Sequence, residues 1–99
     1  MINKIYSVEV RLWEYNGIED DYIEGHTYII RMFNNKYSAE KLSHNNDAIK
    51  DMIRKKIENE TEIGIKIIFV DNISDIPEDG YCYYFDDDDV RIVEYDLYE

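Results

Sequence analysis

The chain has 99 residues, which fits a single domain (1–99), and its 44% hydrophobic residues, with ten tyrosines, are enough to close a modest core. Its 23 acidic and 11 basic residues give a net charge of −12, which argues against direct binding of nucleic acid or of an anionic membrane, because both need lysine and arginine. No apolar run approaches the roughly 20 residues of a membrane-spanning helix, and we expect a cytoplasmic protein.

The first third of the sequence predicts a β-hairpin. Apolar and polar residues alternate over 4–15 with the period of two of a half-buried strand. Asn16 and Gly17 then open a turn, and residues 18–25 are expected to form an acidic loop. Residues 26–34 are again rich in β-forming residues. We therefore expect 4–15 and 26–34 to pair antiparallel around a long acidic tip.

The middle of the sequence predicts one main helix over 47–60, preceded by a short helical turn at 38–42. Asn45 or Asn46 is the expected N-cap. Apolar residues at positions i, i+3, i+4 and i+8 form one stripe that we expect to lie on the sheet. They are Ile49, Met52, Ile53 and Ile57.

The last third predicts three more strands. Residues 63–70 are apolar on both faces, which is typical of a central strand, and 71–80 are expected to form a loop and turn. Residues 81–85 and 90–97 are expected to pair as a second hairpin around 86–89. The predicted fold is α+β, an antiparallel sheet of about five strands in the order ββαβββ with one main helix packed on one face.

No pattern in the sequence indicates catalysis, a cofactor or a metal site, and we expect a protein that is not an enzyme. His26 and His44 lie in different predicted elements, and no phosphate loop or nucleophile elbow is present. Acids close to Cys82 oppose thiolate formation, which favours a structural cysteine. The aspartate run 86–89 lacks the alternating ligands and internal glycine of a calcium loop, which favours loose cation association or a solvated tip.

The negative charge is concentrated near the end of the sequence. Residues 71–99 carry eleven acids against Arg91 alone, whereas 36–66 carry seven bases and six acids. Residues two apart on a strand share one face at roughly 6.6 Å, close to the spacing of successive phosphates, and Glu94 and Asp96 meet this condition. Carboxylates held this way could replace phosphates in a groove lined with lysine and arginine. The alternative is that the charge only keeps the protein soluble.

The candidate partner-binding residues are the acids of the last predicted hairpin, the acids of the first tip and two tyrosines that add contact area. They are Asp86, Asp87, Asp88, Asp89, Glu94, Asp96, Glu19, Asp20, Asp21, Tyr83 and Tyr95. The first-tip acids join the others only if both tips lie on the same side of the molecule. About half of the tyrosines in 81–98 should instead belong to the core.

Small size, large negative charge, an abundance of Ile, Asn, Lys, Asp and Tyr, and no catalytic motif together resemble the small phage-encoded anti-CRISPR and anti-restriction proteins, as a class. The resemblance implies a DNA mimic in the host cytoplasm, a non-enzymatic inhibitor whose acids occupy the basic groove of a CRISPR effector or restriction complex. Two alternatives stay open. One is an immunity protein or antitoxin that neutralises a nuclease toxin, and the other is a structural or regulatory module that forms a homodimer through a sheet edge.

Overall fold

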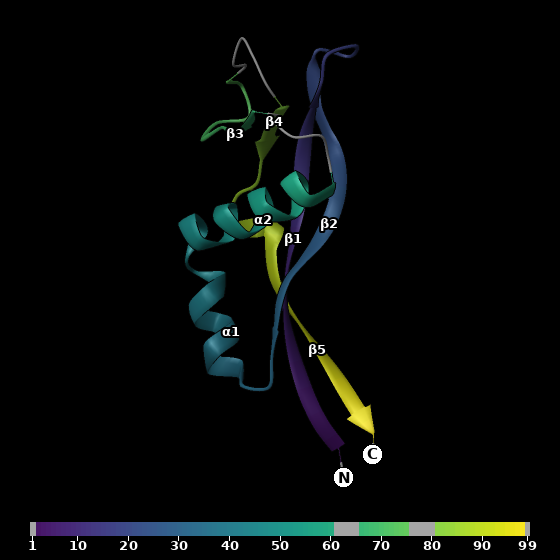
Figure 1. Ribbon diagram of the computed structural model, residues 1–99, viewed down its shortest axis with the longest axis vertical. Coiled ribbons are helices and arrows are strands. Elements are labelled where there is room, and N and C mark those ends of the chain that lie inside the picture. The colour runs from purple at the N-terminus through teal and green to yellow at the C-terminus, as the bar shows by residue number, and fades with distance from the viewer. Residues whose placement is uncertain (1, 61–65, 76–80, 99) are drawn as a thin grey trace.

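The computed structural model describes residues 2–60, 66–75 and 81–98, in which five strands and two α-helices follow the order ββααβββ (Figure 1). The α+β class is confirmed, but there are two helices instead of one, and the sheet is mixed because β3 and β4 are parallel. The elements are β1 (Ile2–Asn16), β2 (Asp21–Phe33), α1 (Lys36–Ser43), α2 (Asn46–Glu60), β3 (Ile67–Phe69), β4 (Tyr81–Tyr84), the 3-10 helix η1 (Asp87–Asp89) and β5 (Val90–Tyr98).

Strand β1 is the centre of the sheet. One of its edges pairs antiparallel with β2, and its other edge pairs antiparallel with β5 over residues 2–10 and with β4 at Trp13 and Glu14. Because β4 and β5 both run opposite to β1, they run in the same direction as each other. The predicted hairpin between 81–85 and 90–97 is therefore wrong. The two strands lie one after the other along a single long edge of β1, with η1 between them.

The first hairpin is confirmed in its pairing but not in its tip. The turn covers only residues 17–20, and β2 begins at Asp21. Tyr22 holds this part of the chain in the sheet, because its ring packs edge-on against Tyr15 at 5.4 Å and its hydroxyl donates a hydrogen bond to the carbonyl oxygen of Asp75 at 2.8 Å. The predicted acidic loop 18–25 is thus mostly strand.

Strand β3 lies at the end of the strand order β2-β1-β4-β3, so its predicted central position is wrong. Its apolar character has another cause, since Ile67 and Phe69 pack on the main core while Ile68 and the following Val70 pack on a second apolar cluster. Residues 63–65 of the predicted strand and 76–80 of the predicted loop lie outside the described residues.

The helices begin where asparagine side chains cap them. Asn45 Oδ1 accepts a hydrogen bond from the Ala48 backbone N–H at 3.1 Å, which confirms one of the two predicted caps of α2. The predicted short turn at 38–42 is instead the eight-residue helix α1, capped in the same way by Asn35. The predicted apolar stripe of α2 is confirmed, with Ile49, Ile53 and Ile57 buried and Met52 packed against them.

The main core lies between the helices and one face of the sheet. Val8, Val10 and Leu12 of β1 are fully buried there against the isoleucines of α2 and Ala39 of α1. The opposite face of β1 carries the odd-numbered residues up to Trp13, and neither of the α-helices among the described residues packs on it. We call it the helix-free face. In the parts of the chain that the structure describes, no helix is long and apolar enough to cross a membrane.

Candidate partner-binding surface

The aspartate run 86–89 is held in a fixed turn by its own side chains. Asp86 Oδ1 accepts a hydrogen bond from the Asp88 backbone N–H at 2.9 Å, and Asp89 Oδ2 accepts one from the Asp86 backbone N–H at 3.0 Å. This reciprocal arrangement is a capping box, which satisfies backbone donors at the start of a helical turn. The run is therefore an ordered turn between β4 and β5, with three of its four residues exposed, and it is not the tip of the predicted hairpin.

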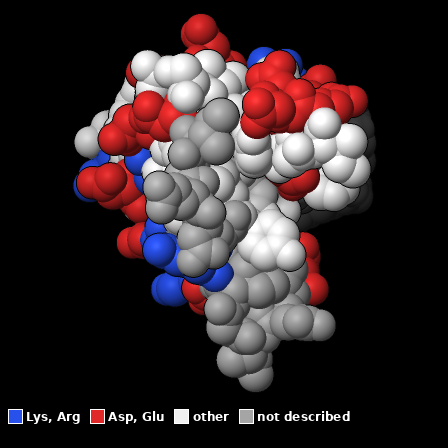
Figure 2. All heavy atoms as spheres, turned by 90° about the horizontal axis from the view of Figure 1, so that it is seen from above, with Lys and Arg blue, Asp and Glu red and all other residues white. Residues whose placement is uncertain are grey.

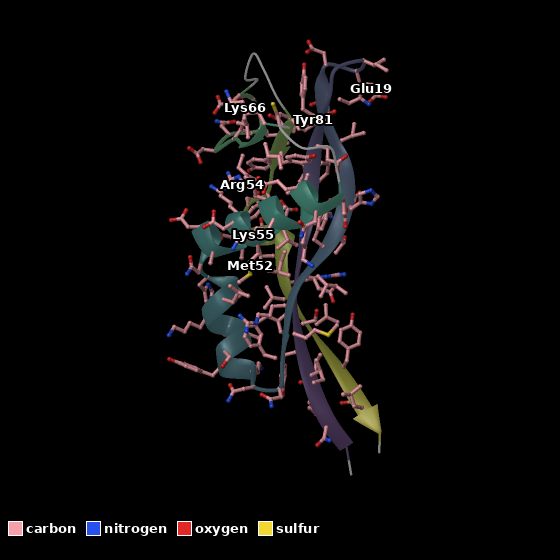
Figure 3. The ribbon with its side chains drawn as sticks, in the orientation of Figure 1. Glu19, Met52, Arg54, Lys55, Lys66 and Tyr81 are labelled. Carbon is pink, nitrogen blue, oxygen red and sulfur yellow. The ribbon has the colours of Figure 1, made fainter. Side chains whose placement is uncertain are left out.

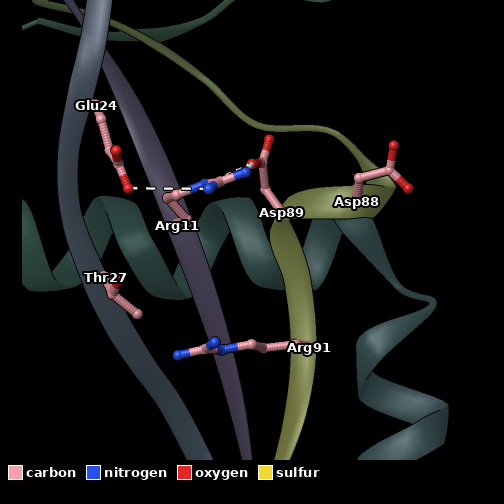
Figure 4. Close-up of a pocket in the computed structure, with 6 residues that line it drawn as sticks. All are labelled: Arg11, Glu24, Thr27, Asp88, Asp89 and Arg91. Carbon is pink, nitrogen blue, oxygen red and sulfur yellow. Dashed lines mark hydrogen bonds and ion pairs between the residues drawn. The ribbon is translucent and has the colours of Figure 1, made fainter.

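Asp89 anchors the run to β1 on the helix-free face. Its side chain is only 4% exposed, and its Oδ1 accepts a hydrogen bond from Arg11 Nε at 3.0 Å (Figure 4). The same oxygen accepts a second one from Trp13 Nε1 at 3.1 Å. Burial alone would raise the pKa of Asp89. The hydrogen bonds from Asp86, Trp13 and Arg11, together with the Arg11 charge, lower it by more than burial raises it, so the pKa lies below the ordinary value. Asp89 is thus an ionised structural residue and does not belong to an exposed surface.

Three shallow hollows adjoin η1, with volumes of about 250, 210 and 330 Å³. The first lies between Arg11, Arg91 and Thr27 (Figure 4), the second beside the start of α2, and the third over Trp13 and Tyr84. Each is lined by exposed carboxylates. We call these carboxylates the acidic surface, which consists of Glu24, Asp71, Asp86, Asp87 and Asp88.

The carboxylates of the acidic surface are held only weakly by neighbouring side chains. Asp87 accepts a hydrogen bond from Asn46 Nδ2 at 3.3 Å, and the ion pairs of Glu24 and Asp71 are long, at 3.8 Å each, and exposed. Exposed pairs of this kind contribute little to stability. Among the described residues, the Asp88 side chain makes no hydrogen bond or ion pair of its own. The acidic surface therefore retains most of its negative charge for a partner.

The first group of predicted acids does not join this surface. Glu19 and Asp20 lie in the turn at the far end of the β1–β2 ribbon, where Figure 3 labels Glu19, and Asp21 opens β2. Gly17, the first residue of that turn, lies four residues beyond Trp13, or about 13 Å along an extended strand. The two groups of acids were expected to lie together if two hairpin tips shared one side of the molecule. This arrangement does not occur, because β4 and β5 do not form a hairpin.

Glu94 and Asp96 also lie apart from η1. They point to the same side of β5, as their spacing predicts, and Lys4 Nζ pairs with Glu94 Oε2 at 3.3 Å. Tyr95 lies five residues beyond Val90, which is about 17 Å along the strand. The predicted acids therefore form three separate groups along a molecule that is 52 Å long.

The two predicted tyrosines have different environments. Tyr83 is 8% exposed and packs 6.1 Å from Phe69, and burial raises its pKa to about 12, so the structure places it in the core and not at a surface. Tyr95 is 41% exposed, and its hydroxyl donates a hydrogen bond to Glu9 Oε2 at 2.9 Å. Tyr95 stays available to a partner through its ring.

Basic side chains gather away from the largest group of acids. Seen from the end that carries the β1–β2 turn, acidic side chains cluster at the upper right, whereas most basic ones lie on the left, where further acidic side chains stand among them (Figure 2). Arg54 and Lys55 of α2 and the nearby Lys66 lie on the helix side of the molecule, away from Glu19 (Figure 3). The helix segment, nearly neutral in sequence, is thus a separate charge environment.

Arg11 and Trp13 are the residues of this region that sequence reasoning missed. They lie 78 and 76 residues before Asp89, and no local pattern connects them to it.

Within 2–60, 66–75 and 81–98, no group of three or more His, Cys, Asp or Glu side chains is placed to hold a metal ion. Fold and surface together define a small acidic α+β protein with a mixed sheet. Comparison with protein-family models, curated proteins and solved structures finds no match for the chain.

Proposed function

We propose that this protein is a non-enzymatic inhibitor that binds the basic nucleic-acid-binding surface of a CRISPR–Cas or restriction complex, with its acidic surface in the place of phosphates. The observation that carries the proposal is the fixed turn of Asp86, Asp87 and Asp88, three exposed carboxylates in succession. The capping box and the Asp89 anchor position them without neutralising them.

Two physical effects support this function. A turn that is already ordered loses little conformational entropy when a partner binds it, so more of the interaction energy appears as affinity. The net charge of −12 attracts a basic groove over a distance and raises the association rate at low salt. Both effects suit an inhibitor that competes with a nucleic acid for the same groove.

The test is a comparison of two charge reversals of equal size. Asp87→Lys with Asp88→Lys changes the acidic surface, whereas Glu58→Lys with Glu60→Lys makes the same change in net charge at exposed positions of α2. Candidate partners come from a pulldown in the native host and from purified CRISPR effector and restriction complexes. We expect the first double variant to lose at least tenfold in affinity, since it replaces two attractive charges by repulsive ones, and the second to lose much less.

The same experiment separates the competing functions. Binding by the wild-type protein should weaken as salt rises, because exposed charges are screened beyond about 8 Å at physiological ionic strength. Equal losses in both double variants would show that only the total charge matters and would refute a defined surface. Capture of a nuclease toxin encoded beside this protein, without binding to any effector or restriction complex, would identify an antitoxin that uses the same acids.

A further inference from the structure

The end of the sheet opposite the β1–β2 turn is a two-stranded ribbon. β1 pairs with β5 from Ile2 and Tyr98 onward, but β2 joins β1 only at Tyr6. Residues 2–5 and 95–98 therefore extend beyond the third strand, at the end that carries both termini (Figure 1). Two strands alone are marginally stable in water. The outer edge of β5 over residues 93–97 has no strand paired with it in the described parts of the chain.

One face of this ribbon is apolar and exposed. Cross-strand partners share a face of a sheet, so Tyr95 lies beside Ile5, and Leu97 lies on the same face two residues further along β5. With Met32 of β2, these residues line an apolar hollow of about 440 Å³. Met32, Tyr95 and Leu97 are each 41 to 51% exposed. This is the lower part of the helix-free face, and a further strand beside β5 would extend it.

The other face of the same strand is acidic. Glu94 and Asp96 alternate with the apolar residues of β5 and point to the opposite side, where Lys4 is paired with Glu94. The Glu94 side chain remains 48% exposed in spite of that pair. The free edge of β5 thus presents alternating apolar and acidic side chains to an incoming strand.

These charges decide between a second copy of the chain and a different partner. Antiparallel pairing of β5 with itself, centred on Tyr95, would place Glu94 opposite Asp96 of the copy, and centring on either acid would place that acid opposite itself. Like charges directly opposite each other are destabilising, and the net charge of −12 adds to the repulsion. Acids on an edge strand oppose self-pairing in this way. A basic strand meets attraction at the same positions.

We propose that the outer edge of β5 over 93–97 binds an extended partner segment in which lysine or arginine alternates with apolar residues. The segment adds a strand to the sheet, so that backbone hydrogen bonds supply affinity and alternate side chains supply specificity. Its apolar side chains extend the helix-free face beside Tyr95 and Leu97, and its basic side chains face Glu94 and Asp96. This surface lies about 17 Å from η1 and does not depend on the function proposed for the acidic surface.

The probes are three capped seven-residue peptides: alternating Lys and Val, alternating Glu and Val, and four Lys followed by three Val. NMR titration of the isotope-labelled protein follows the backbone amides. We expect the alternating Lys peptide to shift the amides of 93–97 and slow their hydrogen exchange, and to bind about tenfold more tightly than the Glu peptide. The blocked peptide has the same composition and charge but cannot match the alternation, and should bind more weakly than the alternating one.

A charge swap makes the test decisive. Glu94→Lys with Asp96→Lys should reverse the preference in favour of the Glu peptide, while Asp87→Lys with Asp88→Lys, an equal change in net charge, should keep the preference for Lys. If the first variant does not fold, as judged by circular dichroism, Glu94→Gln with Asp96→Asn should bring the two affinities within about twofold. Shifts confined to η1, an unchanged preference, or a dimer of the wild-type protein that these substitutions dissociate would overturn the proposal.

Discussion

Replacement of Asp89 by asparagine tests whether this one carboxylate holds η1 on β1. Asparagine keeps one acceptor oxygen but turns an amide NH₂ toward N–H donors, and it loses the ion pair with Arg11. A hydrogen bond to a charged group contributes about 1.5–3 kcal/mol. The Arg11 side chain is 45% exposed, so water can solvate the guanidinium group after its ion pair with residue 89 is lost, which reduces the cost. We therefore expect D89N to lower the free energy of unfolding by about 2–3 kcal/mol.

The assay is urea unfolding followed by circular dichroism, with the emission of Trp13, the single tryptophan, as a second readout at the site. D88N is the matched control. Because the Asp88 carboxylate is exposed, its replacement should change the free energy of unfolding by less than about 0.5 kcal/mol. Because the folded-state pKa of Asp89 lies below its ordinary 3.8, its stabilising effect is complete above that pH and is lost as the pH falls through the folded-state value. The difference in the free energy of unfolding between wild type and D89N should therefore become smaller below pH 3.8. Equal midpoints for D89N and D88N at pH 7 would refute the anchor.

Two destabilising substitutions, one control substitution and one thiol reaction test the rest of the fold. Gly25→Ala should destabilise the first hairpin by about 1–3 kcal/mol in thermal melts, because its Cβ would lie 2.8 Å from a backbone oxygen of β1. Gly17→Ala, with nothing within 4 Å, should have little effect. Tyr95→Phe should lower the midpoint of urea unfolding, since Glu9, 5% exposed, loses its hydroxyl donor. The Cys82 thiol is buried, and burial raises its pKa, so a thiol reagent should react slowly until urea is added; immediate reaction would contradict this burial.

The parts of the fold that could be predicted are those with local signals. Helix α2 carries its cap at Asn45 and its stripe of isoleucines within fifteen residues. The first turn carries its own signal as well, since Asn16 Oδ1 accepts a hydrogen bond from the Ile18 N–H at 2.9 Å. The second hairpin failed because alternation identifies a strand but not its partner. Two strand-like segments around a polar run predict a hairpin unless a third strand is long enough to pair with both.

The candidate site shows the same division between composition and position. The concentration of charge in 71–99 could be read from the sequence, but which aspartate is buried could not, because Arg11 and Trp13 are distant in the chain. Alternation predicted that about half of the tyrosines face the core. The register that pairs Glu14 with Tyr83 decides that Tyr83 belongs to the main core, whereas Tyr84 belongs to the second apolar cluster, with Trp13 and Tyr15, on the other face.

The exposure of the acidic turn follows from a mismatch in length between two strands. Between the pairs Trp13–Tyr84 and Val10–Val90, β1 has two residues, 11 and 12, whereas the opposite chain has five, 85–89. Phe85 continues the alternation of β4 into the core, and Asp89 continues that of β5 toward the helix-free face. The excess is therefore the three residues 86–88, which must leave the edge of the sheet. Chain length places these three side chains in solvent, and their carboxylates give the exposed turn its negative charge.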